Sequence, residues 1–217
     1  AKIDVDVNRV LGTINPNLYG AVWEWRDTIC GGTWVGEDSS IPHIDGFRKD
    51  SIEALQKLSL PVLQWFPQAP FYNWEDGIGP KDKRPQKMLL PWGRVTGHGP
   101  MEVSHEMGTD EFIRFCRLIG AEPFLDTNES DPLGSKNWVE YCNYEGDTKY
   151  ASLRAAHGHP EPHRVKSWHV YAWSDLDPVA YAMDFRKFAT VARLIDPSIH
   201  IIASAAGGSE WVAKFFE

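Results

Sequence analysis

The feature that most constrains the fold of this sequence is a repeated alternation of short apolar runs with longer segments of helical periodicity. An apolar run of strand length recurs five times, and apolar residues then follow at spacings of three or four. Strands that alternate with helices pair in parallel, because each crossover returns the chain to the same edge of the sheet. The sequence therefore predicts an α/β fold with a parallel sheet covered by helices. The predicted strands are residues 18–24, 61–65, 121–127, 165–172 and 199–204.

Capping signals mark where the intervening helices begin. Thr109 opens a helix with Asp110 and Glu111 in its first turn, and this arrangement satisfies free N–H groups and the positive end of the helix dipole. Asp177 precedes Pro178, which is a cap followed by a proline at the first helical position. The other predicted helices begin near residue 47, at Ser135 and at Ser209.

An open doubly wound sheet and a TIM barrel both fit this alternation. The long segment 66–108 follows a strand, and no glycine-rich phosphate loop follows the first strand. Both observations favour the barrel, whose functional loops follow the strands. We therefore predict the five N-terminal β/α units of a (β/α)8 barrel, with residues 1–217 as one domain. Residues 2–7 alternate polar and apolar, which predicts an additional half-buried strand.

Composition excludes several classes of partner. The chain of 217 residues carries a formal net charge of −8, which disfavours nucleic acid and anionic membranes. It has no apolar run of the roughly 20 residues that span a bilayer, and its first residues do not resemble a signal peptide. The odd set of Cys30, Cys116 and Cys142 predicts no disulfide framework. We expect a cytoplasmic protein that uses no cofactor.

Ten tryptophans are several times the usual share, and many of them lie at strand ends or in loops. Large aromatic side chains in such places commonly line clefts for carbohydrate or apolar ligands. The residues Trp23, Trp65, Tyr171 and Trp173 could form an apolar box for a flat ligand. Core packing, or the filling of a vacated sugar pocket, is the alternative interpretation.

Seven segments of the chain carry a specific family resemblance. They are residues 17–20 (NLYG), 34–39 (WVGEDS), 45–50 (DGFRKD), 77–85 (GIGPKDKRP), 120–123 (GAEP), 138–143 (WVEYCN) and 159–162 (HPEP). These segments resemble the α-L-arabinofuranosidases of glycoside hydrolase family 51, and the similarity runs with few breaks from residue 3 to residue 217. The resemblance implies a (β/α)8 barrel that acts on α-L-arabinofuranosides, with a first strand within residues 1–10 that pairs with a C-terminal β-sandwich.

The same resemblance reveals a departure at the expected catalytic position. Family members carry Gly-Asn-Glu at the end of the fourth strand, where the glutamate is the general acid/base. This chain has Tyr171, Ala172 and Trp173 there, and tryptophan has no titratable proton with which to protonate a leaving oxygen. The family's nucleophile glutamate belongs to later strands. We therefore expect native hydrolysis to be lost. Glu24 still matches a sugar-binding glutamate of the family, and Asn128 matches its third-strand asparagine.

Departures from the family cluster at strand ends, while the outward helices and loops match closely. This distribution suggests a pocket rebuilt by engineering for another ligand or reaction, and a natural paralogue that lost activity is the rival explanation.

A half-barrel would expose two sheet edges, which native proteins avoid. The alternative function is therefore a structural or binding module that associates with itself or with a complementary barrel half, unless the chain is a fragment.

Two sets of residues could carry new chemistry. His169 and Asp126 lie on neighbouring predicted strands, and a carboxylate beside an imidazole fixes its tautomer and raises its basicity. Ser204, at the end of the fifth strand, could complete a hydrolase-like trio; the alternative is that His169 points outward under a helix and Ser204 merely packs. Replacement acids at the predicted mouth are Glu24, Asp126, Glu129, Asp131 and Asp175.

A histidine cluster occupies a proline-rich loop. His157, His159 and His163 are spaced two and four residues apart, and such spacing can hold zinc. Because His159 belongs to a segment that resembles the family scaffold, we expect no metal at this loop.

Overall fold

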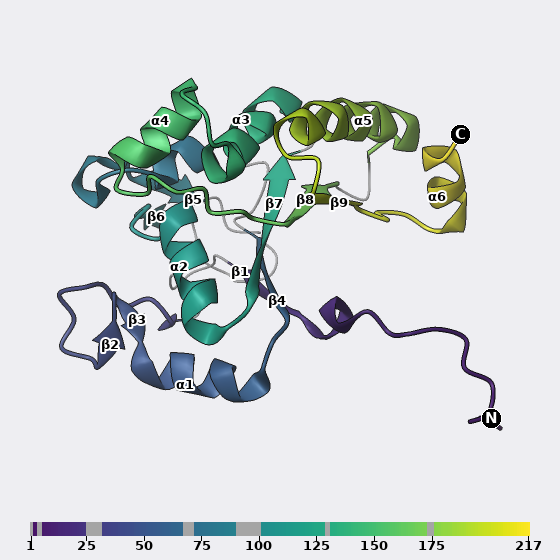
Figure 1. Cartoon of the computed structure of the whole chain (residues 1–217), viewed down its shortest axis with the longest axis horizontal. Helices are drawn as coiled ribbons and strands as arrows, with labels where there is room; N and C mark the ends of the chain where they lie inside the picture. The colour runs from purple at the N-terminus through teal and green to yellow at the C-terminus, as the bar shows by residue number, and fades with distance from the viewer. Residues whose placement is uncertain are drawn as a thin grey trace.

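The computed structural model describes residues 2–3, 6–24, 32–66, 72–89, 101–128, 131–172 and 176–217, with the backbone alone at residues 24, 87–89 and 101–103. Its centre is a five-stranded parallel sheet in the order β1-β4-β7-β8-β9 (Figure 1). The strands follow one another in space as they do along the chain, as in a barrel. A parallel α/β sheet is therefore confirmed. These strands are β1 (Ala21–Glu24), β4 (Val62–Phe66), β7 (Glu122–Asn128), β8 (Ser167–Tyr171) and β9 (His200–Ala203).

The helices surround one side of this sheet, and Figure 1 shows α1, α2, α3 and α5 following one another in an arc around the strands. Each lies between consecutive strands of the sheet, which is the arrangement of β/α units in a barrel. No helix among the described residues is long and apolar enough to cross a membrane. The helices are α1 (Lys49–Leu58), α2 (Thr109–Ile119), α3 (Pro132–Asn143), α4 (Lys149–Ala156), α5 (Pro178–Ile195) and α6 (Ser209–Phe215).

The loops after β1 and β4 carry small elements of their own. Two antiparallel pairs are present, β2 (His43–Ile44) with β3 (Phe47–Arg48), and β5 (Lys87–Leu89) with β6 (Met101–Val103). Short 3-10 helices occur at η1 (Pro16–Tyr19), η3 (Trp74–Gly77) and η4 (Lys81–Lys83).

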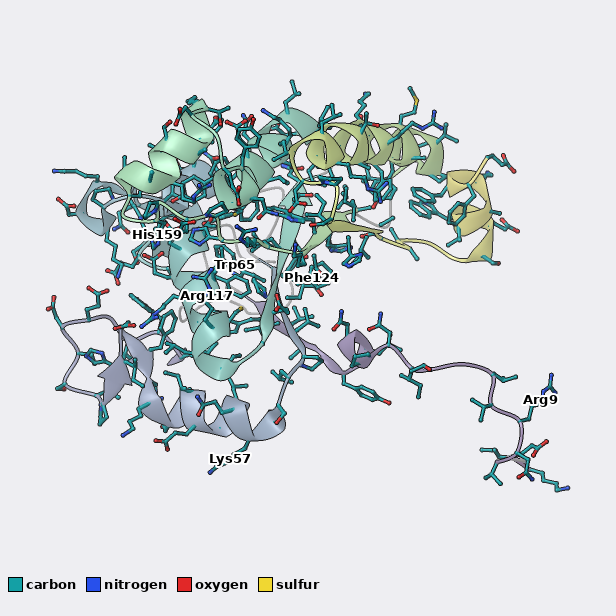
Figure 2. All side chains as sticks on the ribbon, viewed as in Figure 1. Arg9, Lys57, Trp65, Arg117, Phe124 and His159 are labelled. Atoms are coloured by element: carbon teal, nitrogen blue, oxygen red, sulfur yellow. The ribbon has the colours of Figure 1, made fainter. Side chains whose placement is uncertain are left out.

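Aromatic residues fill the layer between the sheet and α2. Trp65 is fully buried and stacks on Phe112 with ring centroids 5.2 Å apart, and Trp23 stacks on Phe115 at 4.4 Å. Side chains alternate between the two faces of a strand. Because Trp23 and Trp65 face α2, every second residue of β1 and β4 faces the same way and the others face the opposite side. Figure 2 shows Trp65 and Phe124 on opposite sides of the sheet. The residues adjacent to Trp23 and Trp65 therefore face away from the helices.

Predicted helix starts are confirmed where a side chain caps the helix. Asp177 Oδ1 accepts hydrogen bonds from the N–H groups of Val179 and Ala180, at 3.1 and 2.9 Å. At α2 the Glu111 carboxylate accepts a hydrogen bond from the N–H of Gly108 at 2.9 Å. These contacts satisfy N–H groups that have no partner within a helix.

Several sequence expectations are wrong in detail. Helix α3 begins before Ser135, because Asp131 accepts a hydrogen bond from the Gly134 N–H at 2.9 Å, while the Ser135 hydroxyl donates to the Asn128 carbonyl. Helix α6 begins at Ser209 as predicted, but Gly208 occupies the cap position that was expected for the serine. Helix α4 was not predicted, because it buries the charged Arg154 where an apolar residue is expected.

The expected strand at residues 2–7 is absent from the described part of that segment. Ile3 and Val7 are 85% and 81% exposed, in extended chain that runs away from the sheet (Figure 1). Alternating apolar residues form a strand when a neighbouring strand and an apolar surface receive them, and neither lies beside this segment in the described structure.

Candidate active site on the inner face of the sheet

The face of the sheet that points away from the helices collects the polar residues of three neighbouring strands. Asp126 of β7 is the register partner of His169 of β8, and His169 is the partner of Ile202 of β9. Ser204 lies two residues after Ile202 and so shares its face. The carboxyl ends of parallel strands meet at one edge of a sheet, where barrel enzymes place their active sites.

Asp126, His169 and Ser204 form a continuous hydrogen-bonded chain. His169 Nδ1 lies 3.1 Å from Asp126 Oδ1, and His169 Nε2 lies 2.9 Å from Ser204 Oγ. The Asp126 side chain is 1% exposed and that of His169 is 14% exposed. An acidic partner at Nδ1 holds the proton on that nitrogen, which leaves Nε2 free to accept the serine proton.

A fourth residue, Gln64 of β4, fixes the carboxylate. Its Nε2 donates to Asp126 Oδ1 at 2.8 Å and lies 3.4 Å from His169 Nδ1. Asp126 Oδ2 is buried and has no hydrogen-bond partner among the described residues. A buried carboxylate without full solvation is stabilised by a neighbouring positive charge. Asp126 Oδ1, which lies 3.1 Å from His169 Nδ1, is therefore the oxygen that orients the imidazole. The sequence gives no signal for Gln64, because its side chain reaches Asp126 diagonally across the sheet instead of through its own register partner Phe124.

The backbone around Ser204 is held from two sides. Ser204 Oγ accepts a hydrogen bond from the Ala172 N–H at 3.0 Å. Tyr181 of α5 receives the Ser204 N–H at 2.8 Å and donates its hydroxyl proton to the Val170 carbonyl at 2.6 Å. These contacts bridge β8 and β9 at their carboxyl ends, so Ser204 is presented to His169 by two strands and a helix.

Aromatic side chains border the trio on the same face. Tyr171 lies 4.9 Å from Phe66 and 6.1 Å from His169, measured between ring centroids. The Phe124 ring lies 6.1 Å from the His169 ring in an edge-to-face arrangement. The site therefore joins a polar hydrogen-bonded chain to an aromatic wall.

Comparison with known proteins places this site on a known scaffold. The family model for the alpha-L-arabinofuranosidase 1 domain matches residues 62–214, which is most of the chain. The chain belongs to the α-L-arabinofuranosidase family. The predicted resemblance to glycoside hydrolase family 51 is confirmed by solved relatives of that family, such as the α-L-arabinofuranosidase from Thermotoga petrophila.

Curated and solved arabinofuranosidases give the extent of the match. The probable α-L-arabinofuranosidase C of Aspergillus niger is 35% identical over 96% of this chain. The intracellular exo-α-L-arabinofuranosidase of Bacteroides ovatus is 34% identical over 99% of it. The arabinose complex of the Thermotoga maritima α-L-arabinofuranosidase superposes with a TM-score of 0.80 at 35% identity and covers 91% of this chain. The chain spans 42% of the length of each of these relatives.

Within this arabinofuranosidase-family chain, the residues that precede the expected acid/base position lie next to the trio, since the Ala172 N–H donates to Ser204 Oγ at 3.0 Å. Residues Tyr171 and Ala172 occupy the end of β8, where the family motif has Gly-Asn. Trp173, in the place of the glutamate, lies outside the described residues, as do Glu129 and Asp175. Glu24 ends β1, and its side chain also lies outside the described part of the chain.

The structure separates Trp23, Trp65 and Asp131 from the inner face and leaves Asn128 on it. Trp23 and Trp65 face α2, because the alternation of their strands directs them to the helix side, so they belong to the core and not to an aromatic box. The Asp131 carboxylate accepts a hydrogen bond from the Gly134 N–H at the start of α3, so it is engaged as a helix cap. Asn128 shares the face and register of Tyr171, at the end of β7.

Proposed function

We propose that this arabinofuranosidase-family chain carries a serine-hydrolase type of site that cleaves a carboxylic ester or a similarly activated acyl group. The observation that carries the proposal is the unbroken chain from Ser204 Oγ through His169 to Asp126, at 2.9 and 3.1 Å. Nucleophile, base and orienting carboxylate within hydrogen-bond reach are the geometric requirement for acyl transfer.

In this mechanism His169 first accepts a proton from Ser204 and then donates it to the leaving group. As Ser204 Oγ attacks the acyl carbon, its proton passes to His169 Nε2, and Asp126 stabilises the imidazolium through the Nδ1–H. The imidazolium then gives the proton to the departing alcohol oxygen, which leaves an acyl-serine. Water attacks this acyl group, gives its proton to Nε2, and the serine oxygen regains a proton as the acid departs.

We further propose that glycoside cleavage has been lost. A glycosidase of the two-carboxylate kind needs a protonated carboxyl and a second carboxylate at about 5–9.5 Å. The carboxylate on the described inner face, Asp126, is engaged by both Gln64 and His169. With tryptophan in the family's acid/base position, the pocket is suited to a ligand or reaction other than the inherited one.

The experiment compares two nitrophenyl substrates. Hydrolysis of p-nitrophenyl acetate should depend on the trio, so Ser204→Ala and His169→Gln should each lower kcat/KM by about 100-fold or more. Ser152→Ala, on the exposed surface of α4, serves as the matched serine control and should change it less than twofold. A fluorophosphonate probe followed by peptide mass spectrometry should label Ser204.

Two outcomes would count against this function. Equal ester hydrolysis by the wild type and Ser204→Ala would show that the serine is a packing residue. Robust turnover of p-nitrophenyl α-L-arabinofuranoside by the pure chain would show that the family chemistry survives without a glutamate at the fourth-strand position.

A second proposal concerns the surface around the site. On the inner face Val22 is 62% exposed and Ile202 is 41% exposed, and they belong to the edge strands β1 and β9. Exposed apolar side chains beside open strand edges favour association. We propose that a complementary set of barrel strands, or a second copy of this chain, covers this face. The mass of the assembly in solution tests the proposal.

A further inference from the structure

A second cluster of titratable side chains lies outside the inner face, where the first turn of α2 meets the loop that precedes β8. His163 Nε2 lies 2.8 Å from Asp110 Oδ1, and His159 Nε2 lies 3.8 Å from Asp110 Oδ2. One ligand atom from each of these three residues lies within 4.8 Å of the others. Figure 2 shows His159 beside the N-terminal end of α2.

The spacing within this cluster suits a single small cation. Two ligand atoms at about 2.0 Å from a tetrahedral zinc ion lie about 3.3 Å apart. His163 Nε2 lies 2.8 Å from one oxygen of Asp110 and His159 Nε2 lies 3.8 Å from the other, and these separations fall on either side of that value. Two imidazoles with one carboxylate form a three-ligand set typical of zinc, with a fourth position open to water. His159 is 40% exposed, which gives an ion a path from solvent.

The carboxylate is oriented by a further hydrogen bond. The Tyr141 hydroxyl donates to Asp110 Oδ2 at 2.8 Å and lies 3.3 Å from His157 Nδ1. Metal-binding carboxylates are commonly held by such outer partners. His163 Nε2 and the Tyr141 hydroxyl each contact a different oxygen of the Asp110 carboxylate, at 2.8 Å in both cases, so the carboxylate is already oriented toward the two histidines.

The loop that carries both histidines is held in place by Arg154. This side chain, 2% exposed, donates to the carbonyls of His159 and Pro160 at 3.0 and 3.2 Å. It also donates to the carbonyls of Tyr141 and Tyr144 on the neighbouring helix. The His163 N–H donates to the Cys142 carbonyl at 2.7 Å. The histidines are therefore presented by a rigid loop, and ordering costs little when an ion binds.

We propose that Asp110, His159 and His163 bind one divalent transition-metal ion, with zinc as the best match to two imidazoles and a carboxylate. On binding, the neutral imidazole of His163 takes the tautomer with its proton on Nδ1, so that Nε2 offers its lone pair to the metal in place of the hydrogen bond to Asp110. The ion would tie the first turn of α2 to the loop before β8. Strand β8, which follows this loop, carries His169. A metal ion bound at the loop would therefore stabilise the position of the strand that presents His169 to the candidate active site.

Zinc chloride alone is the probe. Calorimetric titration of chelator-treated protein should give one zinc per chain, and His159→Ala should weaken the affinity by at least about tenfold. His157→Ala is the matched control, because this histidine lies two residues away and contacts Tyr141 instead of Asp110. It should leave the affinity within about threefold. Zinc should also raise the Tm of the wild type, and that rise should shrink in His159→Ala.

Asp110→Asn provides a second test of the same ion, since it should abolish tight binding in protein that remains folded by circular dichroism. Magnesium should give no Tm shift, because it prefers oxygen ligands. Zinc binding that is substoichiometric, or that is equal in the wild type, His159→Ala and Asp110→Asn, would overturn the proposal. None of these readouts depends on ester hydrolysis, so this proposal and the proposed function can fail separately.

Discussion

At the scale of single residues, buried charges in this chain are each held by several partners. The Arg84 side chain is 4% exposed and pairs with Glu111 at 2.9 Å. It also donates to the carbonyls of Gly79 and His105 at 2.7 and 2.9 Å. Removing one partner of such a network leaves an uncompensated charge and unpaired acceptors in a dry environment. Arg84 therefore joins the loop after β4 to the first turn of α2.

We expect Arg84→Met to lower the free energy of unfolding by about 3 kcal/mol, because the Glu111 carboxylate and several carbonyls lose their donor. Lys83→Met, at a neighbouring position that is 76% exposed, should change it by less than about 0.5 kcal/mol. Urea denaturation followed by tryptophan fluorescence measures both. Similar values for the two variants would mean that the Arg84 network contributes little.

At the scale of elements, helix α5 connects the fold to the candidate site. Its N-terminus is capped by Asp177, and its Tyr181 binds the backbone of Ser204 and Val170. Through Tyr181 the helix positions the serine that faces His169. The stability of the first turn of α5 therefore bears on the geometry of the inner face.

Asp177→Ala should lower the free energy of unfolding by about 1 kcal/mol, since two N–H groups lose their acceptor. Asp184→Ala, in the same helix, removes an exposed pair with Lys187 and should cost less than about 0.5 kcal/mol. Thermal unfolding at matched pH gives the comparison. If the two substitutions were equally mild, the cap would not stabilise this helix.

At the scale of the whole molecule, the described sheet leaves its two edge strands without a neighbour. The chain spans 42% of the length of its relatives, and its five parallel strands correspond to part of their barrel. An open face with Val22 and Ile202 exposed is the surface that the rest of a barrel would cover. The trio borders this surface, because Ser204 follows the edge strand β9.

We expect the protein in solution to have a mass above the 24.6 kDa of one chain, or to form a complex with a separately produced C-terminal barrel half of a relative. Ile202→Lys should weaken either association by at least about tenfold, because a charge would be buried in the interface. Leu194→Lys, at an 81% exposed position on α5, is the control and should leave association unchanged. Native mass spectrometry distinguishes these cases, and a monomer under both conditions would contradict the proposed assembly.

The sequence alone determined the class of fold and the family. The alternation of strands and helices predicted the parallel sheet, because hydrophobic periodicity is a local property of each segment. Capping at Asp177 was predictable for the same reason, since a cap and the N–H groups that it binds lie within one turn. The match at residues 62–214 bears out the resemblance seen in short segments.

Tertiary structure decided which face of each strand is used. Alternation defines two faces, but the packing of helices chooses between them, and it placed Trp23 and Trp65 in the core and His169 on the open side. It also brought Asp110 to His163 across 53 positions of sequence. No local pattern encodes such a contact, because it depends on where two separate segments pack in space.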